Sequence, residues 1–301
     1  MTERKTLKVA AAQYPIDQPA SLEAWRHKIE HWVKEGAATG AALLVFPEYA
    51  AIEQAAAFGP GVSGDLEETL RSVADLARER VAFHQDLAAN YKVHILVGSG
   101  PLRKGDGRYV NAAQLVTPDG SAGVQEKLIM TPFERDWGIT PGHPIRVFDT
   151  ALGKIGIAIC YDSEFPLPVR GMAEAGAEVI LIPSCTERIS GHHRVRTSAR
   201  ARALENQVAT VLSPTICDAL WSPAVDHNAG AAGIYVPSEQ MMSDDGTLAE
   251  GPVNKPQWVA ATIDLERLRR LRHEGEMRNF ADWRCQPGSS CLSGKVELVR
   301  L

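Results

Sequence analysis

Short apolar segments, each long enough for one strand, alternate with helix-patterned segments over the first hundred residues. Residues 6–13, 42–46 and 93–98 are strand-like, and residues 42–46 are apolar on both faces. Between them apolar residues recur at helical spacing. The first predicted helix carries Leu22, Trp25, Ile29, Trp32 and Val33, and a long second one carries Leu66, Leu70, Val73, Leu76 and Val81. This alternation predicts an α/β protein with helices covering sheet faces.

Strand-like segments joined by turns follow, and then helices return. Strands are predicted at 109–116, 123–129, 145–150, 154–160, 178–182, 207–212, 233–236 and 257–263, and helices near 166–175 and 195–206. Ser21 and Asp264 are placed to cap helices. No repeat or linker divides the chain, so we predict one domain over 1–277. The tail, 278–301, has little periodic signal and is either a frayed end or an arm that docks on a partner subunit.

The composition is that of a globular protein. Among 301 residues, 45% are hydrophobic and 23% charged, and a net charge of −5 gives no reason to expect nucleic acid or an anionic membrane as partner. No apolar run approaches the roughly 20 residues of a membrane helix, and no secretory signal is recognised. Five scattered cysteines argue against a disulfide framework, so we expect a cytoplasmic protein.

Cys160 stands where an apolar strand meets a turn. Within residues 154–160 the isoleucines alternate with Gly156, Ala158 and Cys160, so the thiol shares a face with two small residues. A nucleophile at such a strand–turn–helix corner can be reached by a substrate. The alternative for Cys160 is a buried structural cysteine.

Three ionisable residues lie near strand ends. Glu48 directly follows an apolar strand, where partial burial would raise its pKa and make it a better proton acceptor. An ammonium such as that of Lys127, placed beside a thiol, favours the thiolate and stabilises an oxyanion. Glu134 is an acid that can hold such a lysine. Taken singly, each of them is better explained as a solvated side chain.

The motifs around these residues, in this order, resemble those of the nitrilase superfamily of carbon–nitrogen hydrolases. Phe-Pro-Glu ends at Glu48, Glu-Lys-Leu contains Lys127, and Ile-Cys-Tyr-Asp contains Cys160. The resemblance runs from about Leu7 to Ile263. Further matching pieces are Val97-Gly98-Ser99, Asn111, Pro118-Asp119-Gly120, Phe165-Pro166, Arg170 and Ala203-Leu204-Glu205-Asn206-Gln207.

The resemblance implies a four-layer αββα sandwich and a hydrolase that uses no metal or organic cofactor. It implies that Cys160 is the nucleophile, Glu48 the general base and Lys127 the stabiliser of the oxyanion. Glu134 matches a second glutamate beside the lysine, and the backbone N–H of Tyr161 would be an oxyanion donor. Expected substrate contacts in and around the motifs are Tyr49, Glu164, Phe165, Ser184 and His193.

The chain departs from the family pattern near the expected substrate site. Residues 228–233 replace the usual Gly-Gly or Gly-His-Ser turn, and Pro168 is an extra proline in the helix after the nucleophile. Tyr161-Asp162 follows the cysteine, as in many amidases and carbamoylases, whereas true nitrilases commonly have Trp-Glu. We therefore expect a small amide or carbamoyl substrate, with a nitrile as the alternative.

Other polar clusters carry weaker signals. His192, His193 and His227 lack metal-site spacing, so no metal is expected. The arginines on or just before one predicted helix either form a solvated or subunit-facing surface or bind a substrate carboxylate; they are Arg194, Arg196, Arg200 and Arg202. Cys185, Cys217, Cys285 and Cys291 are interpreted as plain thiols.

Rival functions remain open at this point. An acyl transferase would use the same thioester, a papain-like Cys–His pair would need an essential histidine, and a binding or assembly protein could have this fold without activity. The intact catalytic side chains disfavour the last. The resemblance also implies a homodimer or a larger even-numbered homo-oligomer.

Overall fold

Two sheet regions, joined at one seam, form the centre of the protein. The computed structural model describes residues 5–289 and 296–301. The first region runs in the order β12 (Gln257–Asp264), β1 (Thr6–Pro15), β2 (Leu43–Val45), β3 (His94–Arg103), β4 (Tyr109–Val116) and β5 (Ala122–Glu126). The second runs in the order β13 (Val296–Arg300), β6 (Ile145–Thr150), β7 (Gly153–Ile157), β8 (Val179–Ser184), β9 (Ala209–Ile216), β10 (Gly233–Tyr235) and β11 (Thr247–Glu250). The end of β1 pairs in parallel with β9 and closes the seam.

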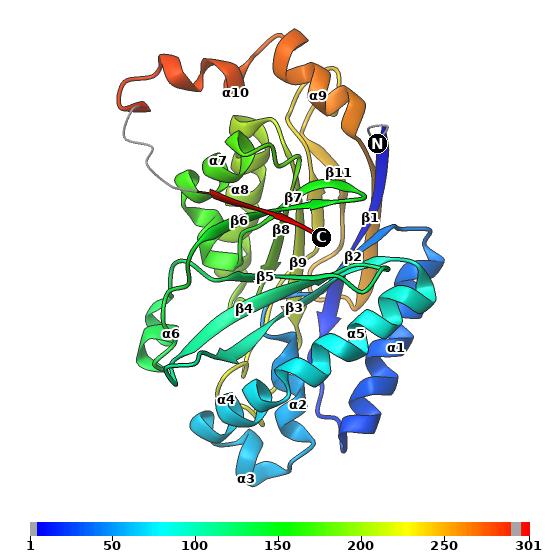
Figure 1. The fold of residues 1–301 in the computed structure, drawn as a ribbon, viewed down its shortest axis with the longest axis vertical. Helices are drawn as coiled ribbons and strands as arrows, with labels where there is room; N and C mark the ends of the chain where they lie inside the picture. Colours follow the sequence, from blue (N-terminus) through cyan, green and yellow to red (C-terminus); the bar gives the residue numbers. More distant parts are fainter. Residues whose placement is uncertain (1–4, 290–295) are drawn as a thin grey trace.

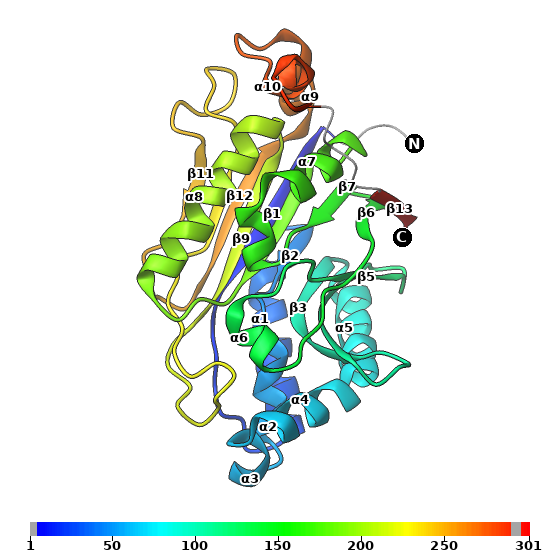
Figure 2. The same cartoon turned by 90° about the vertical axis from the view of Figure 1, so that its left-hand side faces the viewer.

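The alternation of side chains along β1 shows how the layers stack. Leu7, Val9 and Ala11 belong to a core that also contains β6–β9, whereas Ala10, Ala12 and Tyr14 pack against helices. Those helices are α1 (Leu22–Ala38) and α5 (Ala77–Tyr91), while α7 (Pro166–Glu174) and α8 (Ile189–Asn206) cover the second region (Figures 1 and 2). Since both faces of each region are buried, the four-layer αββα sandwich is confirmed.

The prediction of one long helix from Leu66 to Val81 is wrong, because the helix is interrupted at Leu76. It consists of α4 (Leu66–Asp75) followed by α5. The guanidinium of buried Arg80 donates to the carbonyl of Val73, which the end of α4 leaves without its helical partner. The two caps are confirmed: Ser21 Oγ accepts from Ala24 N, and Asp264 accepts from Arg267 N.

Two strands end earlier than predicted, and these ends matter for the site. β5 stops at Glu126 and β7 at Ile157, so Lys127 and Cys160 lie on chain that has left the sheet. The remaining elements are η1 (Ala50–Ile52), α2 (Glu53–Ala56), α3 (Pro60–Ser63), α6 (Pro132–Asp136), η2 (Cys160–Glu164), α9 (Leu265–Glu274), α10 (Asn279–Asp282) and η3 (Trp283–Cys285). In the described part of the chain, no helix has the length and apolar character to cross a membrane.

The described parts of the tail pack on the chain's own elements. The guanidinium of Arg170 on α7 lies 4.6 Å from the ring centres of both Phe280 and Trp283. Strand β13 pairs in parallel with β6 and extends the second sheet region. Docking of the tail on a partner subunit stays a prediction, and Cys291 lies outside the described residues.

Candidate active site

Cys160 sits at a sharp turn just beyond β7. Its φ of 47° lies in the left-handed region, which costs a non-glycine residue roughly 1 kcal/mol or more. The turn is held because Ser163 Oγ donates to Cys160 O at 2.6 Å and Asp162 N donates to Ile159 O at 2.9 Å. The buried thiol lines a cavity of about 870 Å³.

Glu48 follows β2 and is almost fully buried beside this cavity. Its Oε1 accepts from Lys127 Nζ at 2.7 Å and from Asn111 Nδ2 at 2.9 Å, and its Oε2 accepts from Cys185 N at 2.9 Å. Burial raises the pKa of Glu48 above its ordinary value, although the ammonium of Lys127 acts to lower it. A carboxylate with a raised pKa is a stronger proton acceptor.

Lys127 is held between two carboxylates. Its Nζ donates to Glu48 Oε1 and to Glu134 Oε2, both at 2.7 Å. Burial alone would lower the pKa of Lys127, but the two negative charges outweigh it and the pKa lies well above its ordinary value. An ammonium carries three donor hydrogens, so one remains for another acceptor in the cavity.

Glu134 anchors this arrangement from α6. Its carboxylate also accepts from Asn111 Nδ2 at 3.0 Å, from Tyr49 Oη at 2.8 Å and from Thr131 N and Oγ1 at 3.0 Å. Burial acts to raise the pKa of Glu134, but Lys127 and these donors bring it below its ordinary value. Glu134 therefore stays ionised and fixes the position of the lysine.

Cys160 is the predicted nucleophile, and its thiol holds its proton more tightly than an exposed cysteine does. Burial, and after it the charge of Glu48, raise the pKa of Cys160 well above its ordinary value. A base must therefore take its proton before the sulfur can attack. Beside it, the backbone N–H of Tyr161 donates to no other group in the described chain, which leaves a donor next to the sulfur.

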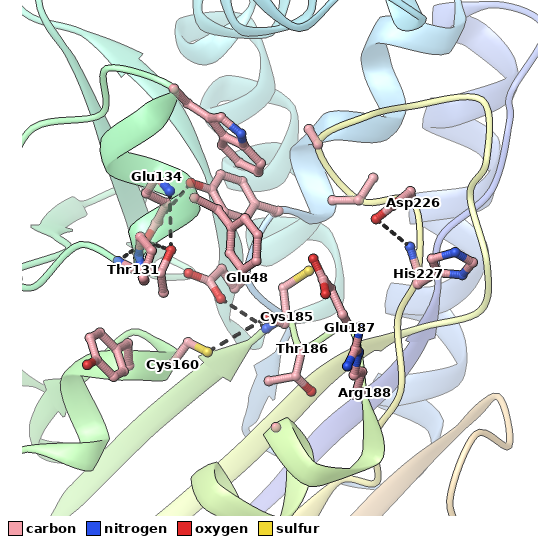
Figure 3. A pocket seen from close by; sticks show the side chains of 18 of the residues that line it. Glu48, Thr131, Glu134, Cys160, Cys185, Thr186, Glu187, Arg188, Asp226 and His227 are labelled. Atoms are coloured by element: carbon pink, nitrogen blue, oxygen red, sulfur yellow. Dashed lines mark hydrogen bonds between the residues drawn. The ribbon is translucent and has the colours of Figure 1, made fainter.

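Figure 3 shows how the cavity is built. Glu134 stands on one side and His227 on the other, with Glu48, Cys160 and Cys185 between them. Other residues that line the cavity are Tyr49, Lys127, Tyr161, Glu164, Glu187, Arg188, Arg194 and Asp226. The structure thus brings all four predicted catalytic side chains together, and two of the predicted substrate contacts, Tyr49 and Glu164, line the same cavity.

The other three predicted substrate contacts do not line the cavity. Phe165 packs edge-on against Tyr161, with ring centres 4.9 Å apart, and His193 packs beside His192 on α8. Ser184 is the buried last residue of β8. These corrections share one reason, since a position near a motif does not determine the direction of the side chain.

Cys185 was interpreted as a plain thiol, yet it forms part of the cavity wall. Its N–H binds Glu48, its carbonyl accepts from Cys160 Sγ at 3.8 Å, and its own thiol donates to Asn228 Oδ1 at 3.1 Å. It directly follows β8, which pairs in parallel with β7. Because parallel strands end at one edge, its position after β8 was the available signal.

Charged residues also line the cavity. Of the four arginines considered above, Arg194 lines it and forms an ion pair with Glu164 at 3.4 Å. The others bind elsewhere: Arg196 to Glu250, Arg200 to Asp245 O, and Arg202 to Glu205 and Ser163 O. Across residues 5–289 and 296–301, no three His, Cys, Asp or Glu side chains are grouped to hold a metal ion.

A thiol, a carboxylate and a buried ammonium lie together in one cavity of an αββα sandwich, an arrangement suited to nucleophilic catalysis by the thiol. Comparison with known proteins shows the family to which the chain belongs. The chain belongs to the carbon-nitrogen hydrolase family, whose sequence model matches residues 8–273.

Individual relatives differ in their named activities. The chain is 36% identical to the probable hydrolase YhcX of Bacillus subtilis over 92% of its own length and 54% of that protein. It is 30% identical to the bifunctional nitrilase/nitrile hydratase NIT4B of Nicotiana tabacum, over 62% of this chain and 55% of that one. The chain thus spans about half the length of these curated relatives.

Solved structures support the fold. A carbon-nitrogen hydrolase from Helicobacter pylori G27 superposes with a TM-score of 0.76, covering 96% of this chain and 99% of that chain at 21% identity. Nit3 of Saccharomyces cerevisiae, described as a member of branch 10 of the nitrilase superfamily, gives 0.68 over 90% and 94% at 23% identity. At these identities the likeness shows the fold.

Proposed function

We propose that the protein hydrolyses the carbon–nitrogen bond of a small amide through a thioester on Cys160. The observation that carries this proposal is the position of Lys127, which bonds to Glu48 and Glu134 at 2.7 Å in the cavity that holds the thiol. Taking an ammonium and two carboxylates out of water at a cavity wall carries a desolvation cost that a hydrophobic side chain would avoid. This ammonium suits an acyl transfer in which negative charge develops on an oxygen.

The first half of the reaction forms the thioester. Glu48 takes the proton of Cys160, and the sulfur attacks the amide carbon as the carbonyl electrons move to oxygen. The third N–H of Lys127 and the N–H of Tyr161 stabilise this oxyanion, each by about 3–4 kcal/mol when preorganised. As the oxyanion collapses, the carbon–nitrogen bond breaks, and protonated Glu48 gives its proton to the departing ammonia or amine.

The second half releases the acid. Glu48, again ionised, takes a proton from a water molecule as the water oxygen attacks the thioester carbon. The same donors stabilise the second oxyanion. When it collapses, the carbon–sulfur bond breaks and the sulfur recovers its proton from Glu48. The carboxylic acid leaves, and no external oxidant, reductant or cofactor is consumed.

An amide is the substrate class we favour, with carbamoyl compounds next. Tyr161-Asp162 after the nucleophile supports this choice, and one relative, the omega-amidase NIT2 of Xenopus tropicalis, is 24% identical over 82% of this chain. A nitrile is the alternative, because the tobacco relative is named as a nitrilase/nitrile hydratase. The even-numbered homo-oligomer and the cytoplasmic location also stay predictions.

A hydrolysis screen tests the proposal. Purified protein is incubated with matched primary amides, ureido acids and nitriles, and the acid and ammonia are quantified. C160A is compared with C285A, a control in which an exposed free cysteine is replaced. We expect turnover of amides by the wild type and C285A and none by folded C160A. Native turnover by C160A would refute the mechanism, and turnover of nitriles without amides would establish the alternative.

A further inference from the structure

Asp162 is a fully buried carboxylate whose oxygens both accept backbone N–H groups. Oδ1 accepts from Ile129 N at 2.8 Å and from Leu128 N at 3.1 Å. Oδ2 accepts from Leu128 N at 3.1 Å and from Ile159 N at 3.3 Å. Its side chain does not line the cavity, so it is not placed to touch a substrate.

These N–H groups belong to two segments from different sheet regions. Leu128 and Ile129 directly follow Lys127, where the chain leaves β5 of the first region. Ile159 directly precedes Cys160, where the chain leaves β7 of the second region. In the described chain, the N–H groups of Leu128 and Ile129 donate to no backbone carbonyl. One carboxylate therefore satisfies donors from both sides.

The oxyanion donors are divided between the same two segments. Lys127 supplies its ammonium from the first, and Tyr161 supplies its N–H from the second. The two donors act on one substrate oxygen only if each lies about 2.7–3.1 Å from it. The relative position of the two segments therefore determines whether both donors can act together.

We propose that Asp162 is a positioning residue that sets the spacing between the Lys127 ammonium and the Cys160 turn, an inference that rests on the proposed amide hydrolysis. Across the described chain, the hydrogen bonds that directly join residues 127–129 to residues 159–162 are those of Asp162. A misplacement of about 1 Å can lower the rate about 100-fold, so the rate of hydrolysis should depend on this spacing.

Other bonds between the two regions hold different residues. Arg146 of β6 donates through its backbone N to Gln125 Oε1 at 2.8 Å and through its guanidinium to Val124 O at 2.9 Å, which ties β5 to the second region without reaching residues 159–162.

Further bonds hold Glu48. Glu48 accepts from Cys185 N through its carboxylate, and its carbonyl accepts from Thr215 Oγ1 at 2.6 Å. These bonds fix the general base rather than the segment after Lys127. The carboxylate of Glu48 also gains and loses a proton during each cycle, whereas Asp162 does not react.

The variant D162N tests this role. An amide has the shape of the carboxylate, but its NH₂ group must face one set of the N–H donors, so one side of the link is lost. The matched control is E53Q, which changes another fully buried carboxylate that accepts a backbone N–H, that of Asp17, outside the cavity. The unfolding midpoints of both variants are measured first, so that the change in kcat of each variant can be compared with its loss of stability.

For amide hydrolysis we expect D162N to lower kcat by about 10- to 100-fold and to change KM less than about threefold. E53Q should retain kcat within about threefold of the wild type, even if its unfolding midpoint falls as far as that of D162N. A folded D162N with wild-type kcat would overturn the inference. An equal loss of kcat in E53Q would do the same, because it would assign the effect to stability.

A second measurement does not require turnover. Acrylamide adds to a thiol with negative charge developing on its carbonyl oxygen, whereas iodoacetamide reacts by displacement at carbon without an oxyanion. The ratio of the two labelling rates at Cys160 therefore reports the oxyanion donors. We expect D162N to lower this ratio by about tenfold or more and E53Q to leave it unchanged.

The two readouts separate the possible failures. If the wild type hydrolyses no amide, the proposed function fails, and the labelling ratio still decides the role of Asp162. If amides are hydrolysed and the ratio in D162N equals that of the wild type, the positioning role is refuted while the function stands.

Discussion

Replacing Lys127 by methionine removes the positive charge that lies between two buried carboxylates. Both ion pairs measure 2.7 Å, and the lysine side chain is 1% exposed, so the ammonium and its two carboxylates are largely removed from bulk water. Breaking a buried pair by removing one partner costs about 3–5 kcal/mol of folding free energy. We expect K127M to lose that amount of stability near neutral pH, together with its hydrolytic activity.

The loss in K127M should depend on pH with a defined sign. Without the ammonium, the folded-state pKa of Glu48 rises further above its unfolded value, and burial then raises that of Glu134 above its unfolded value as well. Groups with raised folded-state pKa values add stability below the unfolded pKa, and that stability is lost as the pH rises through the folded pKa. The difference in unfolding free energy between K127M and the wild type should therefore be larger at about pH 8 than at about pH 5.

Urea denaturation at both pH values measures this difference. K104M is the matched control, because Lys104 pairs with Glu126 while its side chain is 39% exposed, and its loss should stay below about 1 kcal/mol. The triple variant E48Q/K127M/E134Q removes all three charges and should recover much of the stability. Equal losses for K127M and K104M, or a K127M loss that does not change with pH, would refute the reasoning.

Three further predictions follow from the site and its supports. Because burial raises the pKa of Glu48 and the base must be ionised, kcat/KM should fall with decreasing pH at a midpoint above the ordinary glutamate value; a midpoint at or below that value would argue against it. R170A removes the cation that stacks on two aromatic rings of the tail, so stability should fall by about 2 kcal/mol and residues 278–289 should be cleaved faster in limited proteolysis, with unchanged cleavage as the contrary result. In G98A the new Cβ would lie 2.3 Å from Pro47 O at a φ of +85°, so thermal unfolding should show a loss of about 2 kcal/mol or more, and a native-like midpoint would contradict the geometry.

Periodicity predicted an α/β protein with helices on the faces of its sheets, and the family resemblance implied the four layers, but neither predicted every element boundary. Along β1 the alternate residues face the two cores as a strand with two buried faces requires. The break at Leu76 was missed because helical spacing continues across it. The hydrogen bond from Arg80 to Val73 O, which accompanies the break, joins a side chain to a backbone carbonyl. Such a bond cannot be predicted from the spacing of apolar residues.

The candidate catalytic residues were predicted from motifs, whereas the residues that hold them were not. Glu48, Lys127 and Cys160 are far apart in the sequence and were joined by resemblance. The contribution of Cys185 comes mainly from its backbone N–H and carbonyl, which any residue type at that position would supply. Phe165 was misplaced because its ring turns toward Tyr161 and not toward the cavity.

Peptide mass spectrometry of samples quenched with acid during turnover gives the most direct test of covalent catalysis. The account predicts that the peptide containing Cys160 carries the acyl part of the substrate before product accumulates, and that this added mass disappears once the substrate is exhausted. Continued release of acid and ammonia with that peptide unmodified at every time point, or with the acyl group on a different residue, would contradict the account.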